Sequence, residues 1–126
     1  MTELPYTESN VKLIQDFIDE TKKRIHSGVD ITFNRKSNTE IQDLMLEFGI
    51  TTSNIEESIL NLSVENYYRG IDLSGRADYN VCAFRSLIGE GSIEIYLKYG
   101  IETKGLQILI FSNHIPKYPM EQPFKK

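Results

Sequence analysis

The chain has 126 residues, of which 40% are hydrophobic and 25% are charged, and this composition is typical of a globular domain rather than a disordered or fibrous chain. Its length favours a single domain over residues 1–126, because two domains would each be too small to bury a useful core. No apolar run approaches the roughly 20 residues that a membrane-spanning helix needs, so the sequence excludes membrane spanning.

The cellular compartment is expected to be the reducing cytoplasm. Residues 1–5 have neither the basic nor the apolar segment of a secretory signal, and the only cysteine, Cys82, cannot form an internal disulfide. The net charge of −4 is uneven: residues 1–65 carry 6 Lys/Arg against 12 Asp/Glu, and residues 66–126 carry 8 against 6. The second half therefore tolerates a polyanion better than the first.

The first half is predicted to be mainly helical over residues 8–69, after a disordered tail at 1–7. Residues 8–26 repeat apolar side chains at helical period, and Ser9 or Asn10 is a suitable N-cap. Residues 29–33 are short and β-branched, as in a small edge strand. Two further helices are expected after the caps Asn38 or Thr39 and Thr52 or Ser53, the first of them ending at Gly49, and a last short helical turn carries Tyr67, Tyr68 and Arg69.

The second half changes to period two and is predicted to form an antiparallel sheet over residues 78–112. Strands are expected at 79–86, 92–99 and 106–111, with a polar loop at 71–77 and a hairpin turn at 89–92. Residues 113–126 form a proline-rich tail without regular structure. The predicted fold class is therefore α+β, with N-terminal helices packed on a C-terminal sheet of three or four antiparallel strands.

Motifs for cofactors and metals are absent from the sequence. No phosphate-binding glycine loop is present, and His26 and His114 are the only histidines, so neither a nucleotide cofactor nor a metal is predicted. Cys82 lies in the middle of a strand, where a small buried residue is a better interpretation than a nucleophile. Any chemistry must therefore come from ordinary acid–base side chains.

One set of such side chains gathers around the predicted sheet. Tyr96 and Lys98 share the polar face of the central strand, His114 follows the last strand, and Arg69 ends the helical half. RNA cleavage without a metal needs a base for the 2′-hydroxyl, a cation near the phosphate and an acid for the leaving 5′-oxygen, and these residue types can supply all three. They are also common on exposed sheet faces, so a surface without chemistry remains the alternative.

Several segments, in order, resemble the MqsR (motility quorum-sensing regulator) family of bacterial toxins. The similar segments are Ile31 to Asn38, Glu47 to Ile50, Ile59 to Gly70, Ile93 to Lys98 and His114 to Lys125. The resemblance implies a RelE-like fold, a metal-independent endoribonuclease that cleaves mRNA, and a cognate antitoxin that neutralises it. The sequence departs from the family near Ala83, where family members have a glutamine.

The resemblance also implies roles for particular residues. The family's basic residue after a tyrosine pair corresponds to Arg69, its strand tyrosine to Tyr96, followed by Lys98, and its catalytic basic residue after the last strand to His114. We expect His114 to be the acid or base, since imidazole exchanges protons near neutral pH. Arg69 and Lys98 would stabilise the phosphorane, and Tyr96 would orient the phosphate or assist proton transfer. The residues expected to bind RNA are Tyr68, Arg85 and Lys117.

Two other functions remain open. A non-catalytic partner-binding module, such as a degenerate toxin relative, predicts that these residues scatter and that an aromatic patch forms around Tyr67, Tyr68 and Tyr118. A binder of single-stranded RNA with aromatic platforms is the third possibility, and the acidic net charge disfavours it. The sequence predicts neither the oligomeric state nor the RNA sequence recognised.

Overall fold

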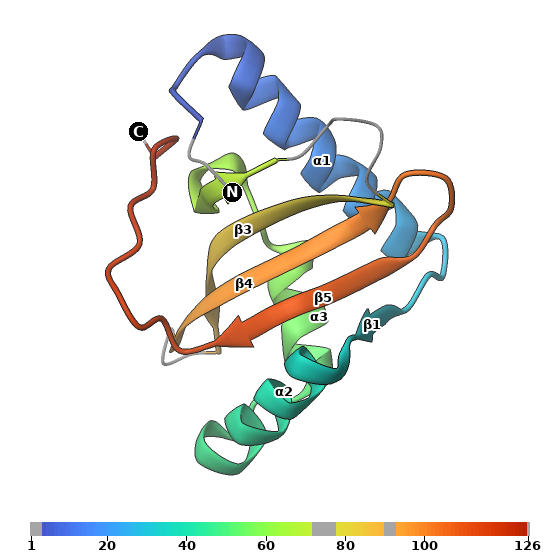
Figure 1. Cartoon of the computed structure of the whole chain (residues 1–126), viewed down its shortest axis with the longest axis vertical. Coiled ribbons are helices and arrows are strands. Elements are labelled where there is room, and N and C mark those ends of the chain that lie inside the picture. The colour runs from blue at the N-terminus through green and yellow to red at the C-terminus, as the bar shows by residue number, and fades with distance from the viewer. Residues whose placement is uncertain (1–3, 72–77, 90–92, 126) are drawn as a thin grey trace.

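The computed structural model describes residues 4–71, 78–89 and 93–125 (Figure 1). The predicted loop at 71–77 and the hairpin turn at 89–92 lie outside these residues, apart from Ile71 and Gly89. The elements in chain order are α1 (Glu8–His26), β1 (Ile31–Phe33), α2 (Arg35–Phe48), α3 (Thr52–Leu60), the 3₁₀ turn η1 (Val64–Asn66), β2 (Tyr67–Gly70), β3 (Tyr79–Ile88), β4 (Ile93–Glu102) and β5 (Ile108–His114).

The α+β class is confirmed, but the predicted sheet of three or four antiparallel strands is wrong. The sheet has five strands in the order β1-β5-β4-β3-β2, and β1 is parallel to β5 while the other pairs are antiparallel. Both edge strands come from the half predicted to be mainly helical: β1 matches the small edge strand expected at 29–33, whereas β2 was predicted as a helical turn. Each is only three or four residues long, so its pairing depends on the tertiary contact with the next strand rather than on a strong local pattern.

One face of the sheet carries the hydrophobic core beneath α1 and α3, which lie behind the sheet in Figure 1. The Phe17 ring of α1 lies 6.1 Å from the ring of Phe84 and 5.2 Å from that of Tyr99, and all three side chains are buried. The Tyr99 hydroxyl donates a hydrogen bond to Thr21 Oγ1 at 2.9 Å, so the buried phenol has a polar partner.

The other face of the sheet, which carries Arg85, Tyr96, Lys98 and His114, is called the open face here. Among the described residues, Figure 1 shows no helix across it. The helix α2 lies instead along β5 and adds hydrogen bonds to the backbone of β5 at and beyond the end of β1. Ser37 Oγ donates to the Ile110 carbonyl at 2.6 Å, and the Asn113 N–H donates to Glu40 Oε1 at 3.1 Å.

The helix boundaries differ from the predicted ones mainly at the caps. The N-caps are Thr7, Asn34 and Thr51, each earlier in the chain than expected, and Gly49 ends α2 in the left-handed conformation with φ 70°. Residues 4–7 belong to the expected disordered tail, yet the Leu4 N–H donates to the Tyr67 hydroxyl at 3.2 Å. The described part of this tail therefore packs against the protein.

Two further differences concern the site. Tyr67–Gly70 form strand β2 rather than a helical turn, and β5 continues to His114 instead of ending at Phe111. The polar residues Ser112 and Asn113 suggested the end of a strand, but both are buried with partners from α2. Lys36 Nζ donates to Ser112 Oγ at 2.9 Å, and Asn113 Nδ2 donates to the Ser37 carbonyl at 2.9 Å. Within the described residues, no helix is long and apolar enough to cross a bilayer.

Candidate functional site

A β-bulge in β2 brings two consecutive side chains to the open face. Tyr67 pairs with Phe84 and Arg69 pairs with Ala83, so Tyr68 is an additional residue between the two pairs. The Arg69 guanidinium lies 4.2 Å from the Tyr68 ring centroid and donates a hydrogen bond to the Tyr68 hydroxyl. Tyr67 is fully buried in the core, so the aromatic patch expected around Tyr67 does not form at the surface.

Cross-strand pairing then aligns the other predicted residues on the open face. Arg85, Tyr96 and His114 are direct neighbours on β3, β4 and β5. Lys98 is the neighbour of Ala83, two register positions further along and on the same face. The rings of Tyr96 and His114 stack with centroids 5.0 Å apart and an interplanar angle of 18°. Tyr68 adds an edge-on contact to Tyr96 at 6.2 Å, so three rings follow one another across the sheet.

A hollow of about 200 Å³ opens over these rings and is closed on one side by the C-terminal tail. Of the seven predicted residues, five line it: Tyr68, Arg69, Tyr96, His114 and Lys117. The other lining residues, Pro116, Tyr118 and Met120, belong to the tail. We refer to this space as the tail hollow, and it is the candidate functional site.

Two of the predicted residues do not line the tail hollow. Arg85 makes an ion pair with Glu94 at 2.9 Å and donates to Gln122 Oε1 at 3.1 Å, so its guanidinium is already engaged within the protein. Lys98 shares the open face, but its Nζ lies 5.9 Å from the ring centroid of Phe111, beside the second bulge of the sheet. Lys98 thus contributes a positive charge near the hollow but does not line it.

Arg69 brings a positive charge that no carboxylate neutralises within the described part of the chain. Its contacts are with the Tyr68 ring and hydroxyl, and its Nε is buried without a hydrogen-bond partner there. An unpaired buried donor costs roughly 1–3 kcal/mol, so packing against Tyr68 has to hold this side chain in place. Such a cation suits an anionic ligand.

Each ring nitrogen of His114 has a polar neighbour. Nδ1 lies 2.8 Å from the carbonyl oxygen of Ile115, which can accept a hydrogen bond from an Nδ1–H, and in that tautomer Nε2 is the nitrogen that can take a proton. Glu40 Oε2 lies 3.9 Å from Nε2, while the other oxygen of the same carboxylate accepts the Asn113 N–H. The sequence gives no sign of this role for Glu40, because a glutamate in the first turns of a helix is common there: its charge interacts favourably with the positive end of the helix dipole.

Burial sets the protonation of Tyr96. Desolvation raises the pKa of the Tyr96 phenol above its ordinary 10.0; the charge of Arg69 opposes this, and Tyr68 and Glu40 add to it. The phenol therefore stays protonated at neutral pH and is able to donate a hydrogen bond to a ligand. Tyr96 cannot act as the base in this site.

His114 separates the tail hollow from a second, acidic hollow of about 300 Å³ beside α2. The acidic hollow is lined by Glu40, Asp43, Leu44, Glu47, His114, Ile115 and Lys117. Aromatic and cationic residues thus surround the imidazole on the side of the tail hollow, and carboxylates surround it on the side of α2. This arrangement keeps negative charge next to His114 but away from the walls that carry Arg69.

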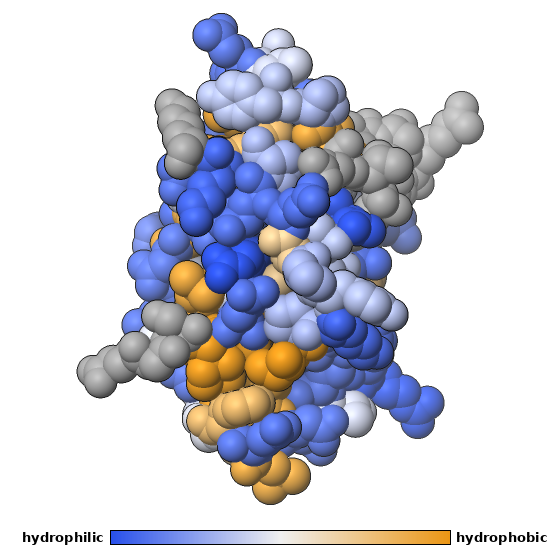
Figure 2. Space-filling view, turned by 90° about the vertical axis from the view of Figure 1, so that its left-hand side faces the viewer, coloured by the Kyte–Doolittle hydropathy of each residue, from blue (hydrophilic) through white to orange (hydrophobic). Residues whose placement is uncertain are grey.

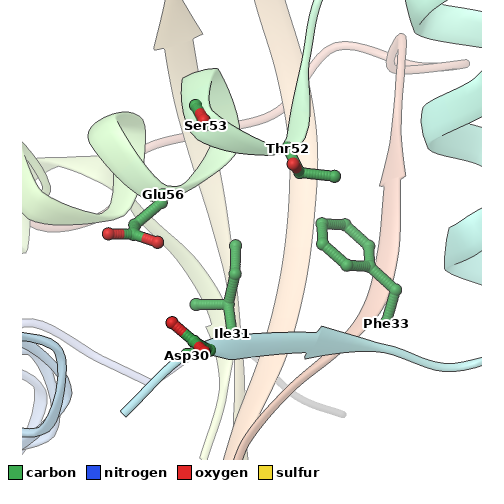
Figure 3. Close-up of a pocket in the computed structure, with 6 residues that line it drawn as sticks. All are labelled: Asp30, Ile31, Phe33, Thr52, Ser53 and Glu56. Atoms are coloured by element: carbon green, nitrogen blue, oxygen red, sulfur yellow. The ribbon is translucent and has the colours of Figure 1, made fainter. Parts of the chain in front are cut away.

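A third hollow of about 260 Å³ lies between β1 and the start of α3 (Figure 3). Its walls are Asp30, Ile31, Phe33, Thr52, Ser53 and Glu56, and none of the predicted residues is among them. Figure 3 shows Phe33 and Thr52 at one side of the space and the two carboxylates at the other. Because these walls include acids and no base, the hollow does not suit a phosphate.

Neither a metal site nor a reactive cysteine is found among the described residues. No group of three or more His, Cys, Asp or Glu is arranged there to hold a metal ion. Cys82 is fully buried, and burial raises the pKa of its thiol well above the ordinary 9.0, so the nucleophilic thiolate is disfavoured.

Comparisons with protein-family models, with curated proteins and with solved structures found no match to this chain.

Proposed function

We propose that this chain is a metal-independent endoribonuclease that cleaves mRNA in the cytoplasm, a toxin similar to the MqsR family with a RelE-like fold and a cognate antitoxin. One observation carries the proposal: an imidazole, a protonated phenol and a guanidinium without a carboxylate partner among the described residues, those of His114, Tyr96 and Arg69, line the same hollow. They come from β5, β4 and β2, so the fold and not the local sequence brings them together.

The roles follow from which groups can accept a proton at neutral pH. Among the described residues that line the tail hollow, Arg69 and Lys117 are cations and Tyr96 is a neutral phenol, so His114 is the side chain there that can act as the base. In the proposed reaction, His114 Nε2 takes the proton of the ribose 2′-hydroxyl, and the 2′-oxygen forms a bond to phosphorus.

The leaving group departs as this bond forms. The bond from phosphorus to the 5′-oxygen breaks, and Tyr96 supplies the proton that this oxygen needs. Arg69 stabilises the charge that gathers on the phosphorane, and Lys98 adds longer-range positive charge from the same face. The products are a 2′,3′-cyclic phosphate and a 5′-hydroxyl end. His114 then releases the proton that it took and Tyr96 regains the proton that it gave, both by exchange with water.

Part of the acidic net charge lies away from the tail hollow. Asp16, Asp19 and Glu20 belong to α1, on the face of the sheet opposite the tail hollow (Figure 1). Asp16 is also paired with Lys12 at 2.8 Å. The RNA would approach the face that carries Arg69 and Lys117.

Induction in growing cells tests the proposal. Wild type and His114→Ala are induced side by side, and total RNA is mapped for new 5′ ends. We expect the wild type to arrest growth and fragment mRNA, and the variant to do neither. Normal growth with intact RNA in both strains would refute the toxin-ribonuclease function.

A non-catalytic partner-binding module is the second candidate, and a specific surface favours it. The end of α2 exposes Met45, Leu46 and Phe48, with Leu46 88% exposed. Figure 2 shows an apolar area at the end of the molecule where α2 lies in Figure 1. Ala83, which replaces the family's glutamine between Arg69 and Lys98, also fits a relative that has lost activity. RNA cleavage by the purified chain would exclude this candidate.

A further inference from the structure

The C-terminal tail is fixed at both ends of the segment that closes the tail hollow. Its beginning continues β5 at His114, and its far end is anchored by Phe124, which is 1% exposed and stacks on Tyr67 with centroids 4.8 Å apart. Gln122 adds two hydrogen bonds, from Arg85 and to the Glu65 carbonyl. In Figure 1 the tail runs from the end of β5 along one margin of the sheet toward the N-terminal part of the chain. Residues 116–120 are therefore held beside the open face.

This fixed segment presents apolar groups to the tail hollow. Pro116, Tyr118 and Met120 line it opposite the stacked rings of the sheet, and Tyr118 is 79% exposed to solvent. The exposure of an aromatic ring to water is unfavourable, and a ligand that stacked on the ring would remove apolar surface from water. Two basic residues, Arg69 and Lys117, also line the hollow.

We infer that the tail hollow is a nucleobase subsite, in which Tyr118 stacks on one base of a single-stranded RNA whose phosphate lies against Arg69. The inference rests on the proposed ribonuclease function and names the contact that would hold the substrate there. A volume of about 200 Å³ is smaller than the roughly 300–1,000 Å³ of pockets for drug-sized ligands, so it suits one ring system rather than a whole nucleotide chain. Aromatic stacking recognises single-stranded bases with little sequence preference.

The test uses a 2′-O-methyl RNA oligonucleotide that carries one 2-aminopurine, a fluorescent base whose emission is quenched by stacking. Without a free 2′-hydroxyl this probe is bound but not cleaved. The full chain is compared as wild type, Tyr118→Phe and Tyr118→Ala. Leu106→Ala is the matched control, because Leu106 is 61% exposed and precedes the opposite end of β5.

The expected result is quenching and similar affinity for wild type, Tyr118→Phe and Leu106→Ala. Tyr118→Ala should bind about 5- to 100-fold more weakly and lose the quenching. Its cleavage of unmodified RNA should show a raised KM with a smaller change in kcat, because the ring binds the substrate without taking part in proton transfer.

Two outcomes would overturn the inference, and they can be told apart. If wild type cleaves RNA but Tyr118→Ala binds and cleaves with unchanged constants, the nucleobase subsite is refuted while the ribonuclease function stands; Tyr118 would then serve a protein partner. If wild type neither binds the probe nor cleaves RNA, the proposed function fails and the subsite fails with it.

Discussion

At the scale of single residues, Glu40 is the side chain whose effect on His114 is easiest to isolate. In Glu40→Gln the amide oxygen can still accept the Asn113 N–H, but the negative charge near His114 Nε2 is gone. Because the two groups are 3.9 Å apart and partly exposed, we expect a fall in kcat of about fivefold with KM unchanged. Steady-state cleavage kinetics measure this split.

The control for Glu40 is Asp43→Asn. Asp43 lines the same acidic hollow and loses the same charge, but no contact to His114 is found for it among the described residues. Its kcat should stay within twofold of wild type. Equal losses in the two variants would show that the general charge of the acidic hollow matters and that Glu40 does not position the imidazole.

The contributions of the Tyr96 hydroxyl and of its ring can be tested separately. Tyr96→Phe keeps the stacking on His114 and removes the group that supplies a proton to the leaving oxygen. If Tyr96 is the acid, kcat should fall about 100-fold while the thermal midpoint of unfolding changes little. A kcat within threefold of wild type would limit Tyr96 to packing against the imidazole.

At the scale of elements, Phe124 is predicted to anchor the tail against β2. Replacing it with alanine removes a buried ring that stacks on Tyr67 and should lower the free energy of unfolding by about 3–5 kcal/mol. Urea denaturation measures this loss. The exposed Tyr118 provides the comparison, because its replacement by alanine should change stability by less than about 0.5 kcal/mol. Equal stability of the two variants would mean that the tail is not anchored at Phe124.

The elements also show how far sequence patterns reach. The helix at 8–26 and the central strand follow from apolar periodicity, because each buries one face along its whole length. β1 was expected as an edge strand, but its parallel partner β5 is 77 positions away in the register, so local patterns do not reveal the pairing. The polar end of β5 looked like a loop because the hydrogen bonds of Ser112 with Lys36 and of Asn113 with the Ser37 carbonyl are tertiary.

The candidate site was anticipated in part for similar reasons. Alternation along β4 puts Tyr96 and Lys98 on the polar face, which a sequence can indicate. The bulge at Tyr68 and the ion pair that engages Arg85 depend on neighbouring strands and leave no local signal. Glu40 approaches His114 only because α2 packs along β5.

At the scale of the whole molecule, buried ionisable groups predict a loss of stability in alkali. Burial raises the pKa of Cys82 and Tyr99 above the ordinary 9.0 and 10.0, so the folded chain keeps protons that the unfolded chain releases. Since the unfolded state then binds fewer protons, the free energy of unfolding falls as pH rises above about 9, by up to about 1.4 kcal/mol per pH unit for each group.

Urea denaturation at pH 7, 8, 9 and 10 checks this dependence. Cys82→Ala should decline less steeply than the wild type between pH 9 and 10, because the group that ionises first in the unfolded chain has been removed while Tyr99 still contributes. Wild type and variant with the same slope in this interval would contradict the account of the core.

The central claim is that His114 and its neighbours cleave RNA without a metal, and the most direct measurement is cleavage of a defined single-stranded RNA by the purified chain in EDTA. The account predicts fragments with 5′-hydroxyl and 2′,3′-cyclic phosphate ends. The rate should fall about 100-fold or more in His114→Ala, and cleavage should vanish where the substrate carries a 2′-deoxyribose at the cut site. Intact RNA with wild type, or equal cleavage by His114→Ala, would contradict it.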